Sequence, residues 1–136
     1  NSCLSNDHAN VLNFLMSKYK KLLSKTKKIR NLYDEKLFKL GISSIQTQSD
    51  TVSNNHKFVI KVQDRDNLKA YLETKNIQSQ IHYALPLSKM KMFHTEQQMP
   101  NAEKFCGDVL SLPIHPFLED YEVAYVCKCI GEFYGV

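Results

Sequence analysis

Residues 5–41, SNDHANVLNFLMSKYKKLLSKTKKIRNLYDEKLFKLG, decide the fold prediction for this chain. The stretch has no proline, and its only glycine is the last residue, Gly41. Its apolar residues recur mostly at the spacing of a helix. They are Leu12, Leu15, Tyr19, Leu22, Ile29, Leu32, Tyr33 and Leu37. Ser5 or Asp7 suits the N-cap, and Gly41 suits the position after the C-terminus. We therefore predict one helix over residues 5–40.

This helix is too long for a small domain. It would span on the order of 50 Å at ~1.5 Å per residue, whereas a compact domain of 136 residues has a radius of gyration of about 14 Å. Part of the helix would protrude unless it bends or breaks near Ser24. We expect the protruding part to pack on another domain or subunit. The chain also begins at Asn1 without an initiator methionine, so we expect a fragment or a processed product.

After Gly41, short strands are predicted to alternate with helices. The clearest strand is HKFVIKV at residues 56–62, in which Phe58, Ile60 and Val62 share one face. Further strands are expected at residues 42–46, 77–83 and 110–112. Helices are expected after Asp64 or Asp66, as a short turn at 89–94, and from Pro100 to Val109. A last helix is expected from Glu119 or Asp120. Its buried stripe would consist of Val123, Val126, Ile130 and Phe133. This order predicts an α+β fold: a long N-terminal helix followed by a small sheet covered by helices.

Composition indicates a soluble globular domain. Hydrophobic residues make up 43% and charged residues 24% of the chain. No apolar stretch approaches the roughly 18–20 residues of a membrane span, and residues 1–10 lack the pattern of a signal peptide. The cysteines form no CxxC pair, so no metal site is predicted and free thiols in a reducing cytoplasm are expected. They are Cys3, Cys106, Cys127 and Cys129.

Positive charge gathers on the long helix. Residues 17–39 hold eight lysines and Arg30 against Asp34 and Glu35. Base readout and tight phosphate recognition favour arginine, but only Arg30 and Arg65 are present among the 18 basic residues. A solvated helix face is the simpler interpretation, so no nucleic-acid partner is expected. A Lys-rich polyanion-binding domain stays an alternative.

Standard catalytic motifs are missing. The chain contains no GxGxxG, GxxxxGK[ST], HExxH or GxSxG. The two stretches richest in His, Tyr and Pro are IHYALPL at residues 81–87 and LSLPIHP at 110–116. Rigid turns after strands often carry sites. The simpler interpretation is that His82 and His115 are hydrogen-bonded structural residues and that the prolines shape the loops.

At these two stretches the chain resembles the C-terminal part of the DegT/DnrJ/StrS family of sugar aminotransferases. The resemblance covers nearly the whole chain through an ordered series of motifs. The series is NSCLS at 1–5, the pair Lys27–Lys28 followed by Tyr33, HKFVI at 56–60, RDNLKAYL at 65–72, IHYALPL at 81–87, PNAEKF at 100–105 and LSLPIHPFLEDYEVAYV at 110–126. The resemblance implies the small C-terminal domain of a fold-type-I aminotransferase. Residues 1–41 would then link to or pack on an absent large domain, and residues 42–136 would form the small domain.

The resemblance also implies the chemistry of the whole enzyme. A lysine holds pyridoxal phosphate (PLP), glutamate donates its amine, and a keto nucleotide-sugar is aminated. In the family the Schiff-base lysine lies upstream, and no lysine of this chain matches its motif. We therefore expect a chain that is incomplete as a catalyst and holds no PLP alone. Its expected partners are a large PLP-binding domain or a second subunit.

Three residues carry family roles by resemblance. Asn1 matches the Asn that reaches the cofactor phosphate of the neighbouring subunit. His82 and Tyr83 match the His-Tyr pair on the substrate side of the cleft, where a Tyr hydroxyl can bind a sugar or phosphate oxygen. The chain departs from the family pattern elsewhere: Cys3 stands for an Arg, Ser5 for an Asp, Ala84 for a Pro and Ser88 for a His. A non-catalytic structural or binding remnant of the family is therefore the alternative function.

Overall fold

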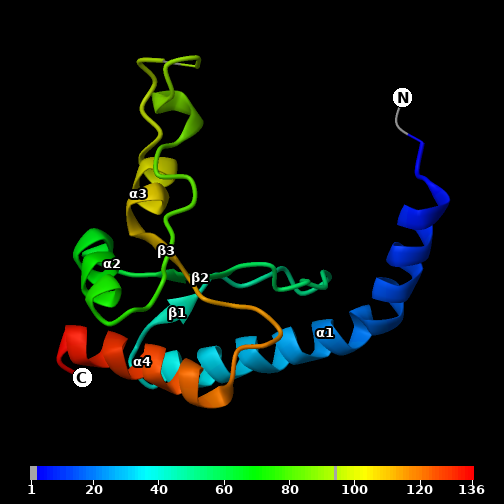
Figure 1. Cartoon of the computed structure of the whole chain (residues 1–136). Coiled ribbons are helices and arrows are strands. Elements are labelled where there is room, and N and C mark those ends of the chain that lie inside the picture. The colour runs from blue at the N-terminus through cyan, green and yellow to red at the C-terminus, as the bar shows by residue number, and fades with distance from the viewer. Residues whose placement is uncertain (1–2, 94) are drawn as a thin grey trace.

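The computed structural model describes residues 3–93 and 95–136 (Figure 1). The chain order of its elements begins with a long helix and ends with a shorter one. They are α1 (Asn6–Phe38), β1 (Ser43–Ser44), β2 (Phe58–Lys61), α2 (Arg65–Thr74), a 3-10 turn (Leu87–Lys89), α3 (Pro100–Asp108), β3 (Val109–Leu112) and α4 (Asp120–Tyr134). The structure confirms the predicted α+β fold.

Helix α1 is continuous over its 33 residues. Ser5 caps its start, where the Ser5 hydroxyl accepts a hydrogen bond from the His8 amide at 3.2 Å. At its end Gly41 adopts φ 71°, which directs the Ile42 amide back to the Leu37 carbonyl at 3.0 Å. The helix does not break near Ser24. Figure 1 shows it curving, so that its N-terminal half turns away from the rest of the domain.

The sheet has three antiparallel strands in the order β1–β2–β3. Phe58 pairs with Leu112, and Ile60 pairs with Leu110. The predicted strand at residues 77–83 was wrong, because that segment makes a single bridge, Gln80 to Ser111. Left-handed backbone at Asn76 (φ 58°) and Tyr83 (φ 61°) bends the chain on either side of the bridge, so pairing cannot extend.

The core lies between the sheet and the C-terminal half of α1. Tyr33 of α1 stacks on Phe58 of β2 with ring centroids 4.7 Å apart, and both side chains are fully buried. Helix α4 closes the core with Val123, Val126 and Ile130, as predicted, while Phe133 is only half-buried. Burial of these aromatic and aliphatic side chains supplies most of the stabilisation of such a domain.

Arg65 joins α2 to the end of α3. Its buried guanidinium donates from Nη1 to the carbonyls of Cys106 at 3.1 Å and Val109 at 3.2 Å. These bonds fix the point where α3 gives way to β3, because they satisfy carbonyls that the helix leaves free. Asp64 precedes α2 as predicted, but it adopts a left-handed backbone and its side chain makes no capping bond to the helix.

Two parts of the molecule extend from this core (Figure 1). One is the N-terminal half of α1. The other is formed by α3 and residues 84–93 and 95–99, which rise on the opposite side. Both carry exposed apolar side chains. On α1 these include Val11, Leu12, Phe14, Leu15 and Met16, and on the other extension Leu85, Leu87, Met92, Phe93 and Phe105. None of the helices within the described ranges combines the length and apolar character needed to cross a membrane.

Candidate functional site

His82 and Ser111 meet beside the sheet, although they are 29 positions apart in the sequence. Nδ1 of His82 lies 2.8 Å from Oγ of Ser111. Ser111 is rigidly placed in β3, because its backbone pairs with Val59 on one side and exchanges two hydrogen bonds with Gln80 on the other, at 2.9 and 3.0 Å. The sheet therefore sets the orientation of the imidazole, which follows the Gln80 bridge by two residues.

Tyr83 follows His82 in the chain and adjoins this pair. Its side chain is 75% exposed, and its backbone is in the left-handed region at φ 61°, which is uncommon for an aromatic residue. The Lys57 ammonium lies 5.6 Å from the centroid of the Tyr83 ring. This contact is within the range of a cation–π interaction. An exposed, strained tyrosine next to a cation is suited to contact a ligand rather than to stabilise the core.

A cavity of about 710 Å³ opens at His82. Its walls come from residues 56–57 just before β2, from α2, from residues 78–82, and from the end of β3 with the turn that follows it. The lining groups that can carry charge are His56, Lys57, Glu73, His82 and His115. Burial lowers the pKa of the His82 imidazole below its usual value, and the nearby Lys57 and His56 lower it further. Since the usual value is about 6.5, His82 is neutral at physiological pH.

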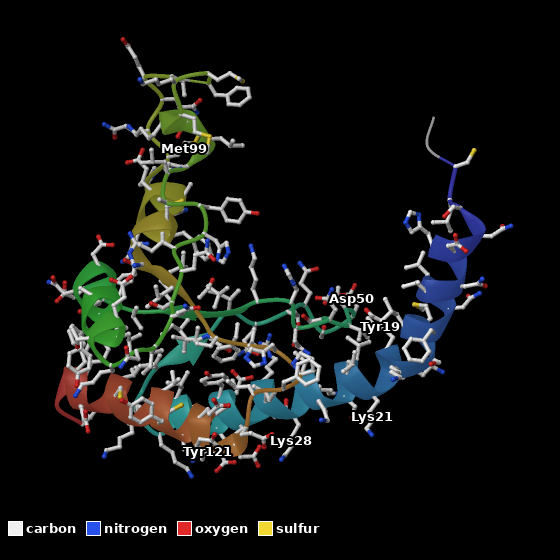
Figure 2. The ribbon with its side chains drawn as sticks, in the orientation of Figure 1. Tyr19, Lys21, Lys28, Asp50, Met99 and Tyr121 are labelled. Atoms are coloured by element: carbon white, nitrogen blue, oxygen red, sulfur yellow. The ribbon has the colours of Figure 1, made fainter. Side chains whose placement is uncertain are left out.

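Tyr83 also borders a second, apolar cavity of about 510 Å³. Its walls belong to the extension formed by α3 and residues 84–93 and 95–99. They include Leu85, Pro86, Met90, Met99 and Phe105. Figure 2 shows Met99 on this extension and Tyr121 at α4, at the other end of the domain. His82 and Tyr83 thus stand at the junction of a polar cavity and an apolar one.

The lysines of this chain do not provide an enclosed cofactor site. Each of them is exposed or only half-buried in the structure. A lysine that holds an aldehyde cofactor is normally desolvated in a pocket. Within the described ranges, His, Cys, Asp and Glu side chains also form no group of three that could hold a metal ion. The described residues therefore do not fit a complete PLP site.

The structure describes two of the three predicted site residues. His82 and Tyr83 lie together at the cavities described above. Asn1, predicted to reach a cofactor phosphate, lies outside the described residues. His115 lines the same cavity as His82, and both histidines are hydrogen-bonded. Sequence reasoning missed Ser111 and Lys57 as members of the site. LSLPIHP had drawn attention to the segment around Ser111, but nothing in the sequence placed it beside His82.

Comparisons with known proteins agree in pointing to one family. The model of the DegT/DnrJ/EryC1/StrS aminotransferase family matches residues 1–131. A UDP-2-acetamido-2-deoxy-3-oxo-D-glucuronate aminotransferase from Pseudomonas aeruginosa is 24% identical over 96% of this chain and 36% of its own length. A dTDP-3-amino-3,4,6-trideoxy-α-D-glucose transaminase from Streptomyces venezuelae is 32% identical over 68% of this chain and 26% of its own length.

Solved structures give the same result. The crystal structure of a DegT DnrJ EryC1 StrS aminotransferase from Brucella abortus superposes with a TM-score of 0.84 and 26% identity. The match covers 95% of this chain and 35% of that one. The chain therefore spans about a third or less of the length of the relatives described here. The fold agrees with the small domain of a sugar aminotransferase that the sequence motifs had predicted.

Proposed function

The chain belongs to the DegT/DnrJ/EryC1/StrS aminotransferase family, and we propose that it is the small C-terminal domain of an enzyme that aminates a keto nucleotide-sugar. In this proposal residues 42–136 form the domain that faces the substrate. Residues 1–41 form the helix through which it packs on a large PLP-binding domain or a second subunit. Asn1 would reach the cofactor phosphate of a neighbouring subunit.

The observation that carries the proposal is the position of His82 and Tyr83. The motif that resembles the family's His-Tyr pair stands between a polar cavity and an apolar cavity in this chain. The Tyr83 ring is exposed, so its hydroxyl could hydrogen-bond a sugar or phosphate oxygen. His82 is oriented by Ser111. These residues would bind and orient the nucleotide-sugar, which raises the rate of a reaction by holding its partners in place.

The cofactor is placed outside this chain in the proposal. PLP is the cofactor of the family, and when bound it supplies the electron sink for amine transfer. The absence of an enclosed lysine among the described residues supports a division of labour. The large domain would hold the cofactor, and this domain would hold the substrate and shape the cleft.

Titration of the isotope-labelled chain with UDP- and dTDP-linked sugars tests the proposal by NMR. We expect saturable changes in the signals of His82 and Tyr83, with a Kd of about 1–10 mM because half a site provides few contacts. Tyr83→Ala should abolish saturation, whereas Tyr121→Ala should not, since Tyr121 is similarly exposed but lies on α4. Signals that stay unchanged up to about 10 mM ligand, or that change equally in both variants, would refute it.

A further inference from the structure

Two histidines of the polar cavity have the same nitrogen engaged. Nδ1 of His115 accepts a hydrogen bond from the Phe117 amide at 3.3 Å. A ring nitrogen that accepts cannot carry a proton, so the proton of neutral His115 is on Nε2. His82 also uses Nδ1, toward the Ser111 hydroxyl at 2.8 Å. Both rings line the cavity.

The burial of Ser111 favours one tautomer of His82. The Ser111 side chain is buried, and in the described part of the chain His82 is the partner recorded for its Oγ. If Nδ1 of His82 carried the ring proton, the Ser111 hydroxyl would accept from it and its own proton would have to find another acceptor in the cavity. The arrangement in which Ser111 donates satisfies both groups. It leaves Nε2–H of His82 as a donor for a ligand.

The charges around the cavity favour an anion. Lys57 contributes an ammonium group, and His56 adds a third imidazole. Glu73 is the one carboxylate among the lining residues described, and it already forms an ion pair with Lys69. His56 and His115 also border a smaller cavity against α1, whose other described lining residues carry no charge at neutral pH. The Lys57 ammonium and the imidazole N–H donors therefore give the lining groups that can bind an anion, and the 710 Å³ space is of ligand size.

We propose that this cavity binds phosphoryl oxygens, with Lys57 as the cationic anchor, with His82 and His115 as Nε2–H donors, and with Ser111 as the residue that positions His82. Such a site matches the donor chemistry by which proteins hold phosphate groups. The identification of the natural ligand rests on the proposed function, because that enzyme offers two sources of this chemistry. One is the diphosphate of the nucleotide-sugar, and the other is the phosphate monoester of the cofactor.

The test is an NMR titration of the labelled chain at pH 7 with four compounds. Pyrophosphate and UDP represent the diphosphate, and inorganic phosphate and pyridoxamine 5′-phosphate represent the monoester. We expect saturable shifts at His82, Ser111 and His115. Lys57→Gln should weaken binding about ten-fold or more, as the loss of a charged hydrogen bond predicts. Lys61→Gln is the matched control, because Lys61 is an exposed lysine at the end of β2 and is not among the residues that line the cavity. It should change the Kd less than about two-fold.

The positioning role of Ser111 is tested by a measurement that a purely structural role would not change. In Ser111→Ala the imidazole nitrogen shifts of His82 should move from one tautomer to a mixture, and Ser111→Thr, which keeps the hydroxyl, should restore them. If pyrophosphate and UDP bind more tightly than inorganic phosphate and pyridoxamine 5′-phosphate, the natural ligand is the diphosphate of the nucleotide-sugar. If the monoesters bind more tightly, it is the phosphate of the cofactor. Either order supports the anion site, whereas absence of shifts or equal loss in Lys61→Gln would overturn it.

This result is separable from the proposed function. If pyrophosphate binds at the cavity but nucleotide-sugars leave Tyr83 unperturbed, the anion site stands and the proposed function fails. If nucleotide-sugars shift Tyr83 but no phosphate compound shifts the cavity signals, the proposed function stands and the anion site fails.

Discussion

Replacing Phe58 with alanine is expected to lower the free energy of unfolding by about 3–5 kcal/mol. Phe58 has no exposed surface, and its ring stacks on Tyr33 at 4.7 Å. It lies in the central strand, so its ring joins the sheet to α1. The substitution would lose the transfer energy of the ring, its stacking contact, and the packing around the remaining cavity. Urea unfolding followed by circular dichroism measures the loss.

The control for Phe58 is another phenylalanine. Phe117 is 70% exposed in the turn before α4, so Phe117→Ala should change the free energy of unfolding by no more than about 0.5 kcal/mol. Equal effects of the two substitutions would show that Phe58 is not the centre of the core. A loss below about 1 kcal/mol at Phe58 would contradict the packing described here.

Charge on the apolar side of the α1 N-terminal half should block assembly without unfolding the domain. The relevant enzyme is a chimera in which this chain replaces the matching segment of the S. venezuelae transaminase. Leu12 and Leu15 are about half exposed in the isolated chain, and burying a leucine fully is worth about 2–3 kcal/mol. Leu12→Glu with Leu15→Glu should therefore weaken assembly of the chimera by about 100-fold. Light scattering measures the assembled fraction.

A matched pair of substitutions separates charge from apolar contact. Asn10→Glu with Asn13→Glu adds the same charge to the same half of α1, where both asparagines are exposed. This variant should assemble like the unaltered chimera. In the 136-residue chain alone, neither variant should lower the melting temperature by more than about 2–4 °C. Assembly that survives the leucine substitutions would show that α1 does not pack on the rest of the enzyme.

Periodicity predicted the large elements because it reports the surface each residue faces. The predicted helix at residues 5–40 became α1 at Asn6–Phe38, and the alternation in HKFVIKV became β2. Pro100 opened α3 as expected. The length of α1 also predicted its protrusion, since a rigid rod longer than the domain must leave it or bend. These features depend on local sequence, so one sequence was sufficient.

Segments that depend on distant contacts were not predicted. Residues 77–83 contain alternating apolar side chains, but the left-handed backbone at Asn76 and Tyr83 limits them to one bridge with Ser111. The hydrogen bond between His82 and Ser111 joins residues 29 positions apart. The spacing of residues in the sequence does not predict such a pair, because the sheet brings its two members together. The family resemblance drew attention to His82 and Tyr83, whereas Ser111 and Lys57 needed the structure.

Amine transfer by the chimera is the most direct measurement of the central claim, that this chain serves as the substrate-facing domain of a nucleotide-sugar aminotransferase. The account predicts that a dimeric, PLP-loaded chimera converts a dTDP-linked keto sugar to its amine at a rate within about 100-fold of the unaltered S. venezuelae enzyme, a barrier difference below about 3 kcal/mol. It also predicts that Tyr83→Ala removes most of that rate. A dimeric chimera that carries the cofactor and forms no amino sugar would contradict the account.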